Sequence, residues 1–348
     1  MRVLLLGPYP PPHGGVETNL VAIRRFLLKR GIACAVINIT RHRKQEADEI
    51  YYPRNALELV SLLSRLRYDV LHLHVGGLLS RRVLRLGLVC SLAPGKKTVF
   101  TFHSGGYPSL PEAKALRPQS LAGVVLRRFD RVIGVNRQIV EFFQQLGVSP
   151  ERTRLIAPHA FLGDGELTGD LPEPLQAFFR SHQPVLISVG QLEPEYDLPL
   201  QIDVMAQVRE AFPEAGLVLL GHGSLEGSLR KKIKDTAFAE HILLGGDIAH
   251  AVVMRAIATA DLMLRTTLYD GDAISVREAL HLGTPVVATD NGMRPAGVHL
   301  VPVSSSDALL VAIERTLHSS AATSPERMPP PDESNLEAVL RVYEELVK

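Results

Sequence analysis

The sequence predicts an α/β protein made of two doubly wound, Rossmann-like domains. Short apolar runs rich in β-branched residues alternate with segments of helical period along the 348 residues. Such alternation is typical of parallel sheets covered by helices on both faces. It breaks once, in a stretch rich in glycine, proline and acidic residues at 158–174, and then restarts. That composition indicates a linker, so we expect one domain over residues 1–165 and a second over 175–330.

Six apolar runs predict the strands of the first domain, and four helical segments lie between them. The helices over 16–29 and 137–146 are each followed by a glycine, which commonly ends a helix. The expected strands are Val3–Leu6, Ala35–Ile39, Val70–His74, Thr98–Phe102, Val132–Val135 and Arg154–Ile156, and the remaining helices are Leu57–Leu66 and Ser80–Cys90.

The second domain repeats the pattern from the strand Val185–Val189 onward, and a last helix over Glu333–Val347 follows three prolines. Ligands of open α/β sheets bind at the carboxyl ends of the strands, so the loops there are the expected site. The other expected elements are helices Leu198–Phe212, Leu225–Ala239, Ala251–Ala258, Ser275–His281 and Asp307–Leu317, and strands Leu217–Leu220, Ile242–Leu244, Leu262–Arg265 and Pro285–Ala288.

The composition, with 46% hydrophobic and 22% charged residues, is that of a globular protein. The most apolar stretch, Val83–Ala93, is short and contains Arg85, so no membrane-spanning helix is expected. The apolar run at the start of the chain is too short for a signal peptide. Cys34 and Cys90 match no metal or redox spacing, so we expect reduced core residues of a cytoplasmic protein.

The charge is unevenly distributed along the chain. Residues 1–168 contain 24 Lys and Arg against 12 Asp and Glu, whereas residues 169–348 contain 14 against 25. A basic half next to an acidic half indicates either a surface for an anionic partner or two domains that attract each other, and the sequence leaves both open.

Two segments of the first domain are candidate ligand loops. Gly14 and Gly15 precede the first helix, where free backbone N–H groups can meet an anion, although a plain turn would have the same sequence. The dinucleotide fingerprint is absent at this position. His103 follows a strand and precedes two glycines, so we expect it to bind a polar ligand rather than point into solvent.

A third segment, beginning at Asp270, contains the strongest signal. A small-residue loop leads into a helix whose first N–H groups could bind phosphate oxygens, and Glu278 could accept hydrogen bonds from ribose hydroxyls. The alternative is structural, because Ser275-x-x-Glu278 is also a capping box. The residues expected to contact the ligand in this segment are Asp270, Gly271, Asp272, Ala273, Ile274 and Ser275.

Glycines also follow the first two strands of the second domain. Gly190 and Gln191 come after one strand, and Gly221-His222-Gly223 after the next. A single G-x-G motif is weak evidence for a ligand site, but its position at the carboxyl edge of the sheet favours a loop that contacts the donor.

Taken together, these segments resemble the GT-B-fold retaining glycosyltransferases of family 4, the group 1 type, over nearly the whole chain. The segment from Asp270 to Glu278 is similar to the E-x7-E signature of that family. The other positions that carry the resemblance are Gly14, Gly15, His103, Gly190, Leu192, the run Gly283–Ala288 and the last helix with Val342-Tyr343-Glu344-Glu345.

The resemblance implies two domains that face a cleft, with the last helix, 332–348, crossing back to the first domain. It implies a donor held by the second domain, an acceptor held by the first, retention at the anomeric carbon and no metal. His103, Asp270 and Glu278 would then be the catalytic residues. The co-substrate would be a UDP- or GDP-linked sugar, and no other cofactor is expected.

Two departures from the family pattern stand out. The first acid of the signature is Asp270 instead of Glu, and the basic pair expected to neutralise the donor diphosphate is replaced by Gln191 and Tyr196. A departing diphosphate needs its growing charge stabilised. We expect Arg265 or Arg294 to take that role, with Arg277 a further candidate and surface ion pairs the structural alternative.

Other functions remain open on these residues. Asp270-Gly271-Asp272 could hold a metal-bound nucleotide as a D-x-D motif, since hard cations prefer carboxylate oxygens. A sugar-nucleotide epimerase or a nucleotide-sugar-binding protein without catalysis would use a similar scaffold. A nicotinamide dehydrogenase is disfavoured, because neither half has the dinucleotide fingerprint after its first strand.

The acceptor is expected to be a glycan or a lipid-linked sugar of cell-surface polysaccharide assembly. Arg81, Arg82 and Arg85 lie in an apolar helical stretch, with Arg127, Arg128 and Arg131 further on. Such residues fit peripheral association with the inner face of an anionic membrane, or simply a solvated helix face. Nucleic acid is not expected, because the basic residues are not interleaved with aromatics.

Overall fold

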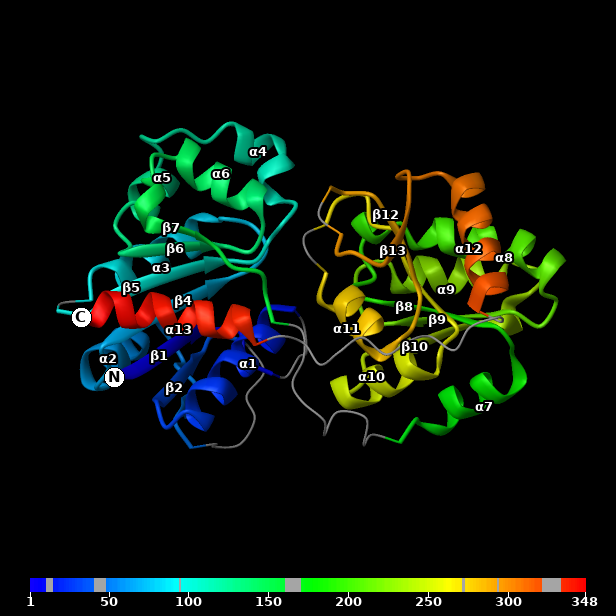
Figure 1. Ribbon diagram of the computed structural model, residues 1–348, viewed down its shortest axis with the longest axis horizontal. Helices are drawn as coiled ribbons and strands as arrows, with labels where there is room; N and C mark the ends of the chain where they lie inside the picture. Colours follow the sequence, from blue (N-terminus) through cyan, green and yellow to red (C-terminus); the bar gives the residue numbers. More distant parts are fainter. Residues whose placement is uncertain are drawn as a thin grey trace. The chain divides into compact units, whose positions relative to one another are not determined.

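The structure is a computed structural model that describes residues 1–10, 15–40, 48–93, 95–159, 170–270, 273–292, 294–320 and 333–348. The chain forms two compact units, Met1–Phe161 with Asp332–Lys348, and Leu162–Pro331 (Figure 1). Each unit is a parallel sheet with helices on both faces. The predicted α/β class with two doubly wound domains is therefore confirmed. None of the helices in these ranges combines the length and the apolar character that a membrane span requires.

The first unit contains, in its described part, a seven-stranded parallel sheet of order β3-β2-β1-β4-β5-β6-β7. The strands are β1 (Arg2–Gly7), β2 (Ala33–Asn38), β3 (Ile50–Tyr51), β4 (Val70–Val75), β5 (Lys97–Phe102), β6 (Arg131–Gly134) and β7 (Thr153–Leu155). The helices are α1 (Gly15–Lys29), α2 (Ala56–Arg65), α3 (Arg81–Ser91), α4 (Pro111–Lys114), α5 (Leu121–Leu126), α6 (Arg137–Gln145) and α13 (Ser334–Val347).

Alternation along the strands of the first unit sorts side chains onto the two faces of its sheet. Leu71, Leu73 and Phe100 join the apolar core that includes residues of α2, α3, α5 and α6. The polar residues His72 and His74 alternate with these leucines on β4, so they point to the opposite face. That face is covered by α1 and α13, which pack beside each other and against β4.

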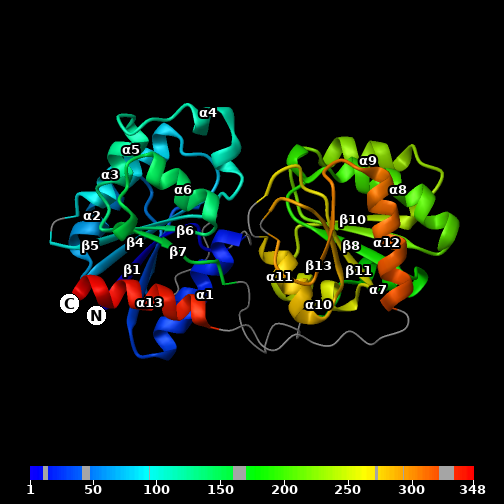
Figure 2. The same cartoon turned by 45° about the horizontal axis from the view of Figure 1, so that its top comes forward.

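The last helix is an integral part of the first unit, as the resemblance implies. Its buried side chains include Leu336, Val339 and Tyr343, the last of which is fully inaccessible to solvent. Figures 1 and 2 both show α13 beside α1, and residues of the two helices are in contact. Exposed ion pairs fasten both ends: Arg30 lies 2.9 Å from Glu337, and Arg154 lies 3.1 Å from Glu345.

The second unit contains, in the part described, a six-stranded parallel sheet of order β10-β9-β8-β11-β12-β13. The strands are β8 (Val185–Val189), β9 (Gly216–Leu220), β10 (Ile242–Gly246), β11 (Leu262–Arg265), β12 (Val286–Thr289) and β13 (Val298–Val301). The helices are α7 (Glu173–Ser181), α8 (Leu198–Ala211), α9 (Glu226–Lys234), α10 (His250–Thr259), α11 (Ile274–Leu282) and α12 (Ser306–Ser320).

The second sheet has a separate apolar core on each face. Leu217 and Leu219 of β9 pack with residues of α8, α9 and α12, whereas Val218 and Leu220 pack with residues of α7, α10 and α11. Figure 2 shows these two sets of helices on opposite sides of the strands. The sheet is thus doubly wound, and its strand ends, not its faces, are where a ligand can reach it.

The expected linker 158–174 is partly wrong, because α7 begins at Glu173. Pro172 is the N-cap of α7, and Pro174 occupies its first turn. Proline is favoured at that place because the first N–H groups of a helix have no intrahelical partner. The same prolines that indicate a linker therefore start a helix.

Candidate functional site

Both sheets reverse their strand order at one point, and the candidate residues gather there. In the second unit the order changes between β8 and β11, and in the first unit between β1 and β4. Loops that leave such neighbouring strands in opposite directions open a crevice at the carboxyl edge of a sheet. Arg265 ends β11, and Gly190 directly follows β8.

Arg265 and Arg294 bind the same carboxylate at this edge of the second sheet. Nε and Nη2 of Arg265 each lie 2.9 Å from Oδ2 of Asp270, and Nη1 of Arg294 lies 3.1 Å from the same oxygen. Arg294 also donates to the Thr289 carbonyl and to Oγ1 of Thr267. The ion-pair alternative for the two arginines is therefore what the structure shows, although the partner is a buried residue of the candidate site.

The cluster of Arg265, Arg294 and Asp270 is buried and has a net positive charge. The exposed fractions of the three side chains are 8%, 1% and 15%. Burial alone would raise the pKa of Asp270, but the two guanidinium groups hold it below its ordinary value of 3.8. Asp270 in turn keeps the pKa of Arg265 above its ordinary value, despite burial. Two charged guanidinium groups and one carboxylate give these three side chains an excess of positive charge.

Tyr196 supports this cluster from the loop after β8. The guanidinium carbon of Arg265 lies 4.5 Å from the centre of the Tyr196 ring, a cation–π contact. Nη1 of Arg265 also donates to the Val189 carbonyl at 2.9 Å. A Cβ atom on Gly190 would lie 2.2 Å from the Tyr196 ring, so only glycine leaves room for this stacking.

The glycines after β8 and β9 are required by backbone packing. A Cβ on Gly221 would lie 1.7 Å from the Gly190 carbonyl oxygen, and one on Gly223 would lie 2.4 Å from the Leu192 carbonyl oxygen. Gly221 also has a φ of +137°, which other residues rarely adopt. These glycines allow close backbone packing at the sheet edge that carries the cluster. Gln191, which follows Gly190, is exposed.

The start of α11 fits the predicted phosphate-binding segment. Ala273 is the N-cap, and among the described residues no side chain caps the helix. No described residue accepts a hydrogen bond from the backbone N–H of Ile274 or Ser275. Such N–H groups can bind an anion. Gly271 and Asp272 lie outside the described residues, as does Gly14 of the first unit.

The capping-box alternative for Glu278 is wrong. Because Ala273 is the N-cap, Glu278 is the fifth residue of α11, in its second turn, and its side chain cannot close a box with Ser275. Its carboxylate is 4% exposed, and Oε1 lies 2.7 Å from Nε2 of His250, the first residue of α10. His250 is a site residue that sequence reasoning missed.

In the first unit, His103 belongs to a cluster with His72 and His74, which we call the histidine cluster. Nε2 of His103 and Nδ1 of His74 share a hydrogen bond of 3.1 Å, and the rings of His72 and His74 lie 3.9 Å apart. The solvent-exposed alternative for His103 is therefore wrong. Burial lowers its pKa to about 3, and the pKa values of the other two also lie well below 6.5, chiefly through burial.

The members of the histidine cluster have different surroundings. His72 is held by Thr101 and by the Tyr343 hydroxyl of α13, so it joins the sheet to the last helix. His74 lies near the carboxyl end of β4, beside the switch point of the first sheet. Its Nε2 atom is buried and has no hydrogen-bond partner within the described residues. His74 was not predicted from the sequence to be a site residue. The signal that could have indicated it is the pair of histidines at alternate positions of an otherwise apolar strand.

Gly15 begins α1 and is exposed, close to the end of β1. The β4 end reaches the same helix start, because a Cβ on Gly76 would lie 2.9 Å from the Val16 side chain. The structure therefore brings the start of α1 and the end of β4 together, as a ligand loop at a switch point requires.

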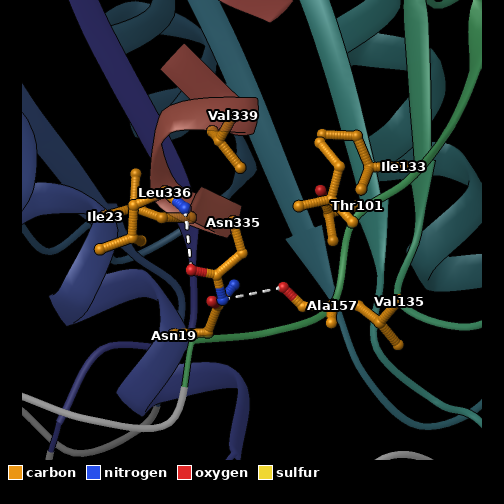
Figure 3. A pocket seen from close by; sticks show the side chains of 10 residues that line it. Asn19, Ile23, Thr101, Ile133, Val135, Ala157, Asn335, Leu336 and Val339 are labelled. Carbon is orange, nitrogen blue, oxygen red and sulfur yellow. Dashed lines mark hydrogen bonds between the residues drawn. The ribbon is translucent and has the colours of Figure 1, made fainter. Parts of the chain in front are cut away.

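A small cavity of about 10 Å³ lies beneath α13 in the first unit (Figure 3). Asn335 donates to the Ala157 carbonyl at 3.2 Å and accepts from the backbone N–H of Leu336 at 2.9 Å. Asn19 accepts from the backbone N–H of His159 at 2.8 Å. A volume of this size holds about one water molecule. The cavity is thus a gap under the last helix and far too small for a sugar.

A metal site was the alternative for the D-x-D motif. In the ranges that the structure describes, no group of three or more His, Cys, Asp or Glu side chains is placed to hold a metal ion. Asp272, the second acid of the motif, lies outside those ranges, and Asp270 is committed to the two arginines.

Two family models match the chain, one in each unit. Residues 13–158 match the model described as Glycosyltransferase Family 4, and residues 174–328 match Glycosyl transferases group 1. Together with the two parallel sheets and their strand-end residues, these matches define a GT-B glycosyltransferase. The chain belongs to the group 1 glycosyltransferases with a family 4 N-terminal domain, and the resemblance seen in the sequence is confirmed.

Curated relatives that match at low identity are named as sugar transferases. The chain is 25% identical over 345 residues to the phosphatidyl-myo-inositol mannosyltransferase of Mycobacterium tuberculosis, a match that covers 90% of this chain and 85% of that protein. It is 23% identical over 250 residues to the putative glycosyltransferase EpsD of Bacillus subtilis. That second match covers 67% of this chain and 62% of EpsD, so the chain spans less than two thirds of that relative.

Solved structures share the fold. The HepE protein of Anabaena in complex with UDP-glucose superposes with a TM-score of 0.72 at 17% identity, covering 99% of this chain and 98% of that one. Sucrose-phosphate synthase from Thermosynechococcus elongatus gives 0.67 at 18% identity, with 99% and 96% covered. At these identities the likeness concerns the fold alone.

Proposed function

We propose that the protein is a retaining, metal-independent glycosyltransferase that moves a hexose from a UDP- or GDP-linked donor to an acceptor hydroxyl. The observation that carries this proposal is the buried cluster of Arg265, Arg294 and Asp270 at the switch point of the second sheet. This net positive charge lies at the carboxyl ends of the strands, where open α/β sheets bind their ligands. A donor diphosphate is the anion that such a site fits.

The cluster can supply the charge that the missing basic pair would bring. Tyr196 stands at one of the positions where the family pattern has a basic residue, and the Arg265 guanidinium lies over its ring. A cation reaches the same neighbourhood, but from β11 instead of from the loop after β8. Arginine can bind phosphate oxygens in a bidentate manner, and a preorganised cation stabilises the leaving group most as its charge grows.

The transfer itself breaks one bond and makes one. The bond between the anomeric carbon of the sugar and the diphosphate oxygen breaks, and its electrons leave with the diphosphate. The acceptor oxygen forms a bond to the same carbon, and its proton goes to the departing diphosphate. The nucleoside diphosphate is therefore the second product, and the two guanidinium groups of the cluster would stabilise it as it forms.

The remaining donor contacts follow from the second sheet edge. The start of α11, at Ala273, Ile274 and Ser275, would bind phosphate oxygens through backbone N–H groups. Gly190 and Gly221 allow the close packing of the strand ends on which these groups lie. Glu278 would accept hydrogen bonds from the ribose hydroxyls.

His103 would contact the sugar as a neutral group. Because its pKa is about 3, its ring is uncharged at neutral pH, and its Nδ1 atom can donate or accept one hydrogen bond while Nε2 is bonded to His74. It is therefore suited to orient a sugar hydroxyl and not to act as a cationic acid. We propose the first unit as the acceptor side of the reaction, as the family resemblance implies.

The names of the relatives support the choice of substrates. HepE has been crystallised with UDP and with UDP-glucose, and the mycobacterial relatives are named as phosphatidyl-myo-inositol mannosyltransferases. We therefore place UDP-glucose and GDP-mannose first among the donors, and a glycan or a lipid-linked acceptor of cell-surface polysaccharide or glycolipid assembly first among the acceptors.

A basic and apolar surface on α3 and α5 supports a lipid-linked acceptor. Arg81, Arg82 and Arg85 are exposed on α3, which packs against α5. Leu78 and Leu92, at the two ends of α3, are 54% and 55% exposed. Neither helix contains an acidic residue. Basic and apolar side chains on one surface favour adsorption to an anionic bilayer.

The more distant arginines do not extend this surface in full. Arg127 donates to the carbonyls of Pro118 and Leu146, and Arg131 lies 3.8 Å from Glu345. Only Arg128 of that group is strongly exposed. The test is sedimentation with vesicles of phosphatidylglycerol or phosphatidylcholine, comparing the wild type with the double variant Arg81→Glu and Arg82→Glu. Equal binding of both proteins to anionic vesicles would exclude this surface.

The donor site is tested by isothermal titration of UDP-, GDP-, ADP- and dTDP-sugars, with and without chelator. We expect one nucleotide to bind in the micromolar range in both conditions, and Arg294→Gln to weaken it about tenfold or more. Arg230→Ala is the matched control, because Arg230 is 66% exposed and pairs only locally with Glu226. Failure of the folded wild type to bind any of them would overturn the proposal.

Product analysis separates the two alternative functions. A changed donor released without acceptor would indicate an epimerase. Donor binding with neither transfer nor slow hydrolysis, across acceptor preparations, would indicate a binding protein that has lost catalysis. Transfer with an unchanged anomeric configuration, read by NMR of the product, is the result expected for a retaining transferase.

A further inference from the structure

The contact between His250 and Glu278 joins two helices whose starts lie at the carboxyl edge of the second sheet. His250 is the first residue of α10, which follows β10, and Glu278 lies in the second turn of α11, which follows β11. The two helices pack side by side. Their side chains meet at 2.7 Å, with exposed fractions of 13% for His250 and 4% for Glu278.

A buried carboxylate needs a partner, and helix capping does not supply one here. Taking a charged group out of water is costly unless hydrogen bonds or opposite charge compensate for it. Among the residues that the structure describes, the ion pair of Glu278 is with His250 alone, and no Lys or Arg lies within ion-pair distance. The fold itself has no evident use for a carboxylate at this place, because its neighbours Val276 and Ala279 are core residues.

The chemistry of the contact fixes its direction. An ionised carboxylate can only accept, so we assign the proton of the contact to Nε2 of His250, which then donates to Oε1 of Glu278. This bond restricts the rotation of the carboxyl group and occupies one of its two oxygens. The contact uses Oε1, so Oε2 is the oxygen that the arrangement presents to a ligand.

We propose that His250 is a positioning residue that orients Glu278 to accept hydrogen bonds from the ribose of the nucleotide. The inference rests on the proposed function, since it requires a nucleotide at the edge of the second sheet. His250 touches neither ribose nor sugar in this account. It acts through Glu278, in the way that a second group commonly orients a ligand-binding side chain.

Two nucleotides and their analogues test the role of His250. UDP and GDP are titrated into the full chain by calorimetry, each beside its 2′,3′-dideoxy analogue, which lacks the hydroxyls that Glu278 would bind. The wild type is expected to bind one ribonucleotide at least tenfold more tightly than its dideoxy analogue, because a buried acceptor is left unpaired in the second case. Glu278→Gln should reduce that ratio.

Substitution of His250 should act on the ratio and not on binding in general. We expect His250→Ala to weaken the ribonucleotide about tenfold and the dideoxy analogue less than twofold, since loss of an orienting group typically costs this much. His250→Gln should restore most of the ratio, because its amide N–H can reach the same oxygen. His299→Ala is the control, since His299 is exposed on β13 and lies outside the site.

The outcomes distinguish this inference from the proposed function. If the folded wild type binds neither nucleotide, both fail. If it binds one without discriminating against the dideoxy form, or if His250→Ala leaves the ratio unchanged, the inference fails and the proposed function stands. If His250→Ala lost affinity equally for the ribonucleotide and for its dideoxy analogue, His250 would only support the fold. That result would likewise overturn the inference.

Discussion

Replacing Asp270 by asparagine should leave two buried guanidinium groups without their shared counter-ion. Asparagine keeps the shape of the side chain but removes the charge that Arg265 and Arg294 both contact through Oδ2. All three side chains are less than one-fifth exposed, so solvent screens the interaction only weakly. Breaking one partner out of a buried ion pair costs about 3–5 kcal/mol.

The expected loss is large enough to see in the melting temperature. For a unit the size of Leu162–Pro331, 1 kcal/mol corresponds to about 2–4 °C, so Asp270→Asn should lower its Tm by about 6–20 °C. The matched control is Asp203→Asn, which breaks an exposed pair with Lys232 and should cost about 1 kcal/mol or less. Differential scanning calorimetry measures both variants.

The same variant should respond more strongly to an anion. Pyrophosphate can replace the missing negative charge, so it should raise the Tm of Asp270→Asn by more degrees than that of the wild type. The pKa of Asp270 is below 3.8, so its contribution is complete above that pH and is lost as the pH falls through the lower folded value. The two proteins should therefore converge in stability as the pH falls below the pKa of Asp270 in the folded protein. A Tm within 2 °C of the wild type at pH 7, or no extra effect of pyrophosphate, would refute the reasoning.

Three further perturbations test the framework of each unit. Gly221→Ala should destabilise the second unit by about 2–6 kcal/mol through backbone strain and atomic overlap. The control Gly227→Ala, which has open space around it on α9, should be neutral or slightly stabilising, and equal Tm values for the two variants would contradict this. Tyr343→Phe should cost the first unit about 1–3 kcal/mol in urea unfolding, because it leaves Nδ1 of His72 buried without its partner; an unchanged midpoint would show that the bond contributes nothing. The histidine cluster stays neutral when folded but ionises near pH 6.5 when unfolded, so the first unit should lose about 1.4 kcal/mol per histidine for each pH unit below 6.5, and a flat stability profile from pH 7 to 5 would disprove its burial.

The layers of the fold could be read from the sequence because burial follows the strand period. Leu217, Val218 and Leu219 point to alternate faces, and both faces are apolar because helices cover both. The short elements could not be read in this way. Strand β3 has two residues and exists through its pairing with Val36 and Ile37, and α5 has six residues, too few to show a helical period.

The candidate site was predictable where it is continuous in sequence. The segment from Asp270 to Glu278 shows a loop, a helix start and a buried acid in order, and Arg265 and Arg294 were expected to lie near it. The partner of the two arginines was not predictable, since their contact with one carboxylate oxygen depends on how the segments after β11 and β12 meet. His250 was missed for the same reason, because 28 residues and a complete strand separate it from Glu278.

The place of α13 in the first unit affects how the chain is made in the cell. The residues that it covers on α1 and β4 leave the ribosome early, but α13 itself follows only after the whole of Leu162–Pro331 has been synthesised. At about 5–20 residues per second, that interval is about 10–30 s. During this time the face of the first sheet that carries His72 and His74 lacks the cover of α13. The first unit can therefore complete its packing only after the whole of the second unit has been synthesised.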